Sequence, residues 1–113
     1  LRVLEEVEKR ATGHDRVMVV LDSDHSKKNV LRELNMYSKF VTDGCYLVVE
    51  DTNPDAYDAA YAQYDKADGY ACHAVNEWRP QKHGFSVDKR RERFLFTQNP
   101  NGYLKRGAVV SSE

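Results

Sequence analysis

The chain has 113 residues, enough for one domain with a modest hydrophobic core. Its 17 basic and 18 acidic residues nearly cancel, so the charge balance favours neither a nucleic-acid partner nor a membrane surface. The sequence shows no secretory signal and no apolar run of membrane-spanning length, and Cys45 and Cys72 match no disulfide or metal framework. We therefore expect reduced, buried thiols in a cytoplasmic protein.

The first half of the sequence predicts a helix followed by a strand, helix, strand unit. Residues 1–11 carry apolar side chains at helical spacing. Residues 17–21 are a run of five apolar side chains, typical of a strand covered on both faces, and residues 46–49 form a similar run. Between them, Ser26 can cap a helix over residues 26–41. Its apolar stripe consists of Val30, Leu31, Leu34, Tyr37 and Val41. Short connections of this kind make the two strands parallel neighbours.

The second half of the sequence predicts two more helices and a pair of short strands. Asn53-Pro54 is suited to start a helix, and residues 69–79 are expected to form another. The first of these helices would carry a stripe of Tyr57, Tyr61 and Tyr64, which suits core packing or an acceptor pocket. Residues 85–87 and 94–96 are predicted to form an antiparallel hairpin, whose DKRRER connection we interpret as a solvated turn. The NPNG sequence predicts a further turn at 99–102.

Both predicted parallel strands end in acidic side chains. Asp22 closes the first, and Glu50 and Asp51 close the second. Because equivalent ends of neighbouring parallel strands lie close together, three carboxylates would meet and raise one another's pKa. A hard divalent cation, Mg²⁺ or Mn²⁺, resolves that repulsion. His25 lies three residues after Asp22 and is the candidate general base for a substrate hydroxyl. Turn formation and helix capping explain either motif taken alone, so the metal hypothesis rests on the pair.

Other candidate residues have structural explanations. His14 and His83 are interpreted as surface residues and His73 as a residue of helix packing, because none has partners at metal spacing. Trp78 suits packing, with stacking on a sugar as the alternative.

The sequence motifs resemble one known family. The segment LDSDHSKKNVLRELNMYSKFVTDGCYLVVEDT resembles the central signature of the cephalosporin hydroxylase / rhamnosyl O-methyltransferase family. FLFTQNPNGYLKR resembles the closing motif of that family, and Gly69, Ala74, Val75 and Glu77 match an intervening motif. The family usually has Gly-Pro where this chain has Gly69-Tyr70. The similarity covers almost the whole chain.

The resemblance implies an α/β fold, namely the C-terminal half of a Rossmann-like class I methyltransferase sheet. Parallel strands would be followed by a final antiparallel hairpin, with helices on both faces. S-adenosylmethionine would be the methyl donor, Asp22, Glu50 and Asp51 would hold Mg²⁺, and His25 would be the general base. Asp22 and Ser23 are the candidate cofactor contacts.

The glycine-rich cofactor loop of such a domain has no counterpart in this sequence. Residues 1–113 are therefore expected to be a single partial domain, whose first strand would be an open edge that invites self-association.

The leading functional hypothesis is a metal-dependent O-methyltransferase acting on a hydroxyl of a sugar or glycosylated metabolite, without a nucleic-acid or membrane partner. The alternatives are a cephalosporin-type hydroxylase, which would need iron and a reductant, and a non-catalytic domain that only binds or assembles. The sequence offers no two-histidine, one-carboxylate set at this site, which ranks the hydroxylase lower.

Overall fold

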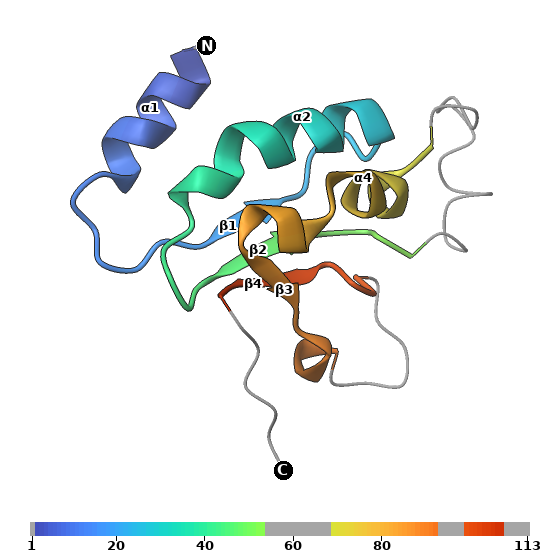
Figure 1. Cartoon of the computed structure of the whole chain (residues 1–113). Coiled ribbons are helices and arrows are strands. Elements are labelled where there is room, and N and C mark those ends of the chain that lie inside the picture. Colours follow the sequence, from blue (N-terminus) through green and yellow to red (C-terminus); the bar gives the residue numbers. More distant parts are fainter. Residues whose placement is uncertain (1, 54–68, 93–98, 108–113) are drawn as a thin grey trace.

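A computed structural model describes residues 2–53, 69–92 and 99–107 as a small α/β fold (Figure 1). Its helices and strands in chain order are α1 Arg2–Ala11, β1 Val19–Leu21, α2 Lys27–Tyr37, η1 Ser38–Phe40, β2 Tyr46–Val49, α4 Ala71–Trp78, η3 Pro80–His83, β3 Phe85–Val87, η4 Lys89–Arg91 and β4 Tyr103–Arg106. No helix in the described ranges is long and apolar enough to cross a membrane.

The four strands form one mixed sheet in the order β1-β2-β4-β3. β1 and β2 are parallel, with Leu21 paired to Val49, which confirms the predicted strand, helix, strand unit. β4 runs antiparallel to both β2 and β3 and lies between them. The sheet therefore begins with a parallel pair, has β1 as its edge, and ends with an antiparallel pair.

The local sequence signals agree with the observed helices. The Ser26 side chain accepts a hydrogen bond from the Asn29 backbone N–H at 3.4 Å and caps α2, as predicted. The helix is shorter than predicted, because α2 ends at Tyr37 and the 3₁₀ turn η1 follows it. The apolar stripe is nevertheless confirmed as core: Val30, Leu34 and, beyond η1, Val41 are buried, and the other two members pack partly buried against them. The predicted turn at 99–102 is present, since the Gly102 N–H donates to the Asn99 carbonyl at 3.0 Å.

Other predictions concern segments that the structure does not describe. The helix expected after Asn53-Pro54, with its tyrosine stripe, and the strand expected at 94–96 lie outside the described residues. Within the described ranges, the antiparallel partner of β3 is β4. Sequence reasoning missed β4 because Tyr103–Arg106 lacks an apolar run and reads only as part of a turn and closing motif.

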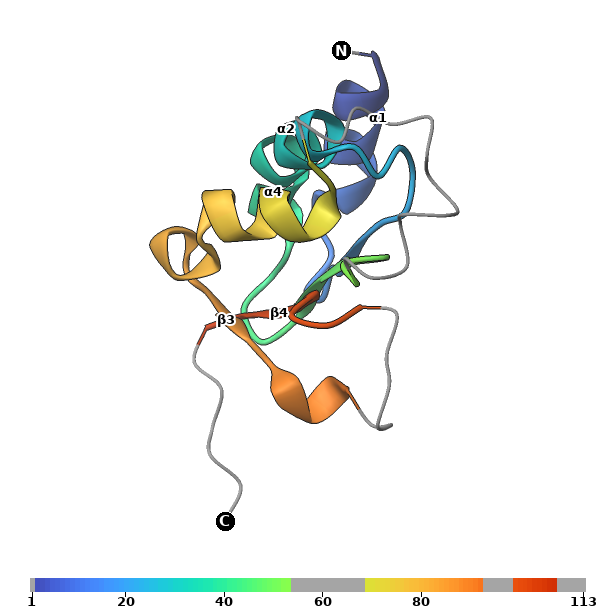
Figure 2. The same cartoon turned by 90° about the vertical axis from the view of Figure 1, so that its right-hand side faces the viewer.

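The core lies between one face of the sheet and the helices α2 and α4. Leu47, Val49 and Leu104 point into this core and are fully buried. Figure 2 shows α1, α2 and α4 on the same side of the strands. On the opposite face Met18 and Val20 are 57% and 48% exposed. For the described residues, the expectation of a first strand covered on both faces is therefore wrong. The expectation of helices on both faces stays a prediction, because the helix expected after Asn53-Pro54 lies outside the described residues.

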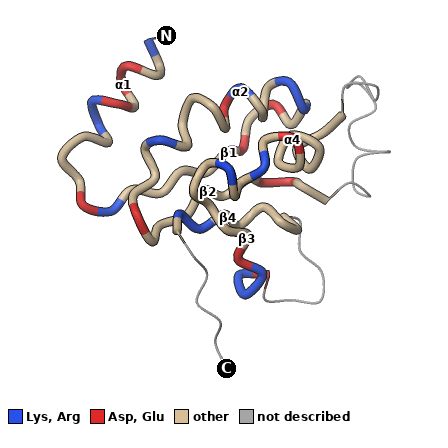
Figure 3. Tube along the Cα trace, viewed as in Figure 1, with Lys and Arg blue, Asp and Glu red and all other residues tan. Residues whose placement is uncertain are grey.

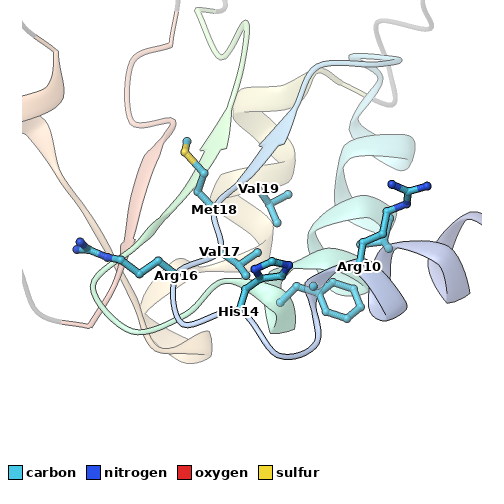
Figure 4. A pocket seen from close by; sticks show the side chains of 9 residues that line it. Arg10, His14, Arg16, Val17, Met18 and Val19 are labelled. Carbon is cyan, nitrogen blue, oxygen red and sulfur yellow. The ribbon is translucent and has the colours of Figure 1, made fainter.

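α1 buries none of its residues. A cavity of about 380 Å³ lies between α1, the residues leading into β1, and η1. Val17 and Val19 form part of its wall, and Arg10 and Arg16 extend to either side (Figure 4). This cavity is at the amino end of β1, whereas the predicted acidic site is at the carboxyl end, so the cavity is separate from that site.

Two further expectations are corrected by the packing. Cys45 and Cys72 are free thiols but only partly buried. Thr42 donates a hydrogen bond to the Cys45 sulfur at 3.2 Å, and this contact, together with Arg16, lowers the pKa of that thiol, whereas burial raises the pKa of Cys72. The DKRRER segment is not wholly solvated, because the Asp88 side chain is fully buried.

Candidate metal and catalytic site

The predicted acidic residues converge at the carboxyl ends of β1 and β2. Asp22 directly follows β1, and Glu50 directly follows β2. The Glu50 N–H donates to the Leu21 carbonyl at 3.1 Å, which extends the parallel pairing to the ends of both strands. Figure 3 shows the resulting acidic segments after β1 and β2 at the same end of the sheet. The parallel register thus brings together residues almost thirty positions apart in the chain.

His25 lies inside this acidic cluster. Its Nε2 is 2.9 Å from Asp51 Oδ2 and 3.7 Å from Asp22 Oδ1. The His25 side chain is 10% exposed, whereas that of Asp22 is 57% exposed and that of Asp51 is 30% exposed. The imidazole therefore forms the inner wall of the cluster, and the two carboxylates lie on the solvent side.

One ligand atom from each of Asp22, His25 and Asp51 lies within 4.8 Å of the other two. A nitrogen and carboxylate oxygens at this spacing can surround one cation. Glu50 is not a member of this tight group, although the sequence placed it there as an equal partner. The sequence also did not predict that His25 would lie in the tight group together with the two aspartates.

Glu50 nevertheless interacts with the cluster electrostatically. A hydrogen bond with the Asp22 carboxyl, partial burial, and repulsion from Asp22 and Asp51 raise the pKa of Glu50 above its ordinary value. Repulsion between crowded carboxylates is the effect expected from the sequence. Crowding of the carboxylates therefore disfavours the charged form of Glu50.

The backbone of Asp51 is held in an unusual conformation. Its φ is +56°, in the left-handed region that costs a non-glycine residue of order 1 kcal/mol or more. Asn99 accepts a hydrogen bond from the Asp51 N–H at 2.8 Å, and Asn99 in turn donates to Tyr103 at 3.2 Å. Sequence reasoning did not assign this positioning role to Asn99. The signal that could have found it is the closing NPNG motif, whose sequence predicts a turn and a family resemblance but no contact with Asp51.

Ser23, the second candidate cofactor contact, lies in the loop before α2 and is hydrogen-bonded to that helix. Its hydroxyl donates to the Glu33 carboxylate, with distances of 3.1 and 3.0 Å to the two oxygens. The Asn29 amide donates to Ser23, at 3.3 Å, and to Glu33, at 3.0 Å. These bonds fix the loop between β1 and α2 and so position His25. Contact of Asp22 or Ser23 with a cofactor stays a prediction.

The other singled-out residues have mainly structural roles. His14 is exposed at the separate cavity beside α1, as expected for a surface residue. His73 is exposed and does not take part in helix packing as predicted. Its Nδ1 accepts a hydrogen bond from the Tyr70 N–H at 2.9 Å and caps the start of α4. Exposed His83 stacks on buried Trp78, with ring centroids 4.0 Å apart. This contact supports the packing interpretation of Trp78.

The fold and the cluster define a class of protein: an α/β domain with carboxylates and a histidine gathered at the carboxyl ends of adjacent parallel strands. A family model described as rhamnosyl O-methyltransferase/CmcI matches residues 1–107. The chain belongs to this family, as the motif resemblance predicted.

Curated relatives agree with this assignment. The chain is 32% identical over 95 residues to proteins named rhamnosyl O-methyltransferase from Mycobacterium bovis and Mycobacterium tuberculosis, covering 80% of this chain and 36% of each relative. A protein of the same name from Mycobacterium leprae is 34% identical over 91 residues, covering 80% of this chain and 39% of the relative. The chain therefore spans a little over a third of the length of these relatives. No solved structure matches it significantly.

Proposed function

We propose that this chain is the C-terminal part of an S-adenosylmethionine-dependent O-methyltransferase that modifies a hydroxyl of a sugar or glycosylated metabolite. The main support is the convergence of Asp22, His25 and Asp51 at two parallel strand ends in a chain of this family. The names of the relatives specify a rhamnosyl acceptor, which makes a rhamnoside the first substrate to test.

The sheet supports the proposed place of the chain within a class I methyltransferase domain. Parallel strands followed by an antiparallel pair are the pattern expected of the C-terminal half of such a sheet. β1 is an open edge, and the exposed Met18 and Val20 lie on its uncovered side. We propose that the cofactor-loop half of the domain covers these surfaces, and that an isolated fragment self-associates through them.

The donor set fits a hard divalent cation. Asp22 and Asp51 of the tight group, with Glu50 beside them, offer carboxylate oxygens, and no thiol belongs to the described cluster. We assign these three carboxylates as the residues that would hold Mg²⁺ or Mn²⁺, which prefer oxygen. A cation held there would lower the pKa of an acceptor hydroxyl.

His25 is the proposed general base. Its nearly buried ring and its contact with Asp51 hold the imidazole within the acidic cluster. The imidazole accepts the hydroxyl proton, and Asp51 stabilises the resulting imidazolium. The acceptor oxygen takes the methyl group of S-adenosylmethionine, which leaves as S-adenosylhomocysteine. Asn99 positions Asp51 through its backbone N–H. Positioning of the two reacting groups supplies much of the rate.

The hydroxylase alternative receives less support from the same geometry. Non-haem iron oxygenases typically use two histidines and one carboxylate, whereas the cluster found among the described residues has one histidine and two carboxylates. Binding without catalysis remains the alternative that the experiment below addresses.

The test is His25→Ala in the full-length gene product, with exposed His14→Ala as the matched control. We expect His25→Ala to lower methyl transfer to a rhamnoside by about 10²–10⁴-fold, because the proton acceptor is lost. Calorimetric titration should show largely unchanged binding of S-adenosylmethionine. Unchanged turnover of His25→Ala would remove His25 from the mechanism, and a wild type that binds neither cofactor nor Mg²⁺ would favour a non-catalytic domain.

A further inference from the structure

A second cavity adjoins the candidate site and has a different lining from the one beside α1. It measures about 290 Å³ and lies between the end of β2, helix α4 and the 99–102 turn. Thr52, the residue after Asp51, is 1% exposed and lines it. Thr52 follows Asp51 in the chain, with their Cα atoms about 3.8 Å apart, so the cavity begins one residue beyond the acidic cluster.

The wall formed by Thr52 and the turn is rigid. The Thr52 hydroxyl donates to the Pro100 carbonyl at 2.6 Å, and Pro100 and Asn101 line the cavity together with Thr52. A Cβ added to Gly102 would lie 2.2 Å from the Val49 carbonyl oxygen, so β2 and the turn are in close backbone contact. This wall is held by the same turn that positions Asp51.

The wall formed by α4 presents two polar side chains, His73 and Asn76, that can hydrogen-bond a ligand. His73 Nδ1 accepts the Tyr70 N–H, so the neutral ring carries its proton on Nε2. The ring also packs against Gly69, where an added Cβ would be 3.0 Å from Nδ1. Asn76 is exposed one turn further along, and its side chain makes no hydrogen bond within the described part of the chain. Both residues line the cavity.

We propose that this cavity binds the sugar ring of the acceptor, with Asn76 and His73 hydrogen-bonding its hydroxyls. The inference rests on the proposed methyltransferase function and assigns the residues that select its substrate. A 6-deoxy sugar such as rhamnose has hydroxyls on its edge and a C–H and methyl surface. The polar groups of Asn76 and His73 match that edge, and the side chains of Val75 and Pro100 match the apolar surface. A ring in this cavity keeps an attached hydroxyl within reach of the adjacent cluster.

The test uses Asn76→Leu and His73→Gln in the full-length gene product, with methyl α-L-rhamnopyranoside as the probe. Asn76→Leu removes a side-chain amide that makes no hydrogen bond within the described part of the chain, and His73→Gln keeps an acceptor for the helix cap but removes the ring Nε2–H. Gln81→Leu is the matched control, since it removes an exposed amide from η3, outside the cavity lining. Ligand-observed NMR and steady-state kinetics give affinity, KM and kcat.

We expect Asn76→Leu to weaken rhamnoside binding and raise KM by about ten-fold, with kcat and S-adenosylmethionine affinity little changed, because one hydrogen bond to the acceptor is lost. His73→Gln should act in the same direction, and Gln81→Leu should match the wild type. The rhamnoside should also slow alkylation of Cys72, which lines the cavity, and leave Cys45 unprotected.

The outcomes separate this inference from the proposed function. Wild-type transfer with an unchanged KM in both cavity variants and no protection of Cys72 would overturn the cavity assignment alone. A wild type that neither binds nor methylates the rhamnoside would overturn this inference, and an absence of transfer to every glycoside tested would overturn the proposed function as well.

Discussion

The substitution Asp88→Asn keeps the shape of a buried side chain and removes its charge. Asp88 is fully buried after β3. Its carboxylate accepts hydrogen bonds from the Tyr46 hydroxyl at 2.5 Å and from Arg90, through the backbone N–H at 3.1 Å, Nε at 2.9 Å and Nη2 at 3.0 Å. These bonds attach η4 to the start of β2. We therefore expect the loss of charge to destabilise the sheet.

The expected loss is about 2 kcal/mol. A hydrogen bond to a charged group contributes about 1.5–3 kcal/mol, and an asparagine at this position keeps one acceptor oxygen but turns an amide toward the donors. The Arg90 side chain is 38% exposed, so water compensates for part of the lost attraction to Asp88. The destabilisation should therefore be smaller than that caused by breaking a fully buried ion pair. For a domain of about 150–250 residues, about 2 kcal/mol lowers Tm by about 4–8 °C.

The effect should also depend on pH. Hydrogen bonds from Arg90, followed by that from Tyr46, hold the pKa of Asp88 well below its ordinary value. The folded protein therefore binds fewer protons at this site than the unfolded chain, and the carboxylate stabilises the fold above the unfolded pKa of about 3.9. That stabilisation is lost as the pH falls from this value through the folded pKa. The difference between wild type and Asp88→Asn should be constant from pH 5 to 8 and shrink below about pH 4.

Thermal unfolding of the full-length gene product over this pH range is the assay. Asp43→Asn is the control, because Asp43 is 99% exposed and pairs with Arg106 at 3.4 Å on the surface. Its Tm should change little, since exposed ion pairs contribute about 0–1 kcal/mol. A Tm of Asp88→Asn equal to that of the control at pH 7 would refute the argument from burial. A difference that persists undiminished at the lowest pH would refute the argument from charge.

Three further outcomes are expected. Gly102→Ala should lower Tm more than Asp88→Asn does, because its Cβ would lie 2.2 Å from the Val49 carbonyl oxygen, and an unaltered melting curve would contradict that close approach. Iodoacetamide at neutral pH should label Cys45 before Cys72, because the Cys45 pKa is lowered and the Cys72 pKa is raised, and mass spectrometry of the peptides gives the order. The isolated 113-residue chain should self-associate in size-exclusion chromatography, and Val20→Lys on the exposed edge should reduce this, whereas a cooperative wild-type monomer would count against an open edge.

The sequence by itself determined the local elements and the meeting of the acidic strand ends. Residue periodicity and the Ser26 cap specify β1, α2 and β2 because these signals act within a few residues. A short connection through one helix leaves two neighbouring strands parallel. Asp22 and Asp51 therefore had to reach the same edge, whichever way the remaining chain folded.

Only the tertiary structure decided how the groups in the site approach one another. His25 lies within 2.9 Å of Asp51 while Glu50 lies outside the tight group, because the loop after β1 and the left-handed backbone of Asp51 set their directions. Asn99 reaches Asp51 from 48 positions away, a pairing that no local pattern contains. Such contacts depend on which distant segments pack together, and that information is spread over the whole chain.

The same reason explains the insertion of β4 and the burial of Asp88. Tyr103–Arg106 becomes a central strand because β2 and β3 each leave a row of backbone groups for it to pair with. Asp88 is buried because Arg90 and Tyr46 supply its hydrogen bonds, although its sequence context is that of a solvated turn. Local composition fixes what a segment prefers in isolation, whereas backbone pairing and charge neutralisation across the fold decide where it finally lies.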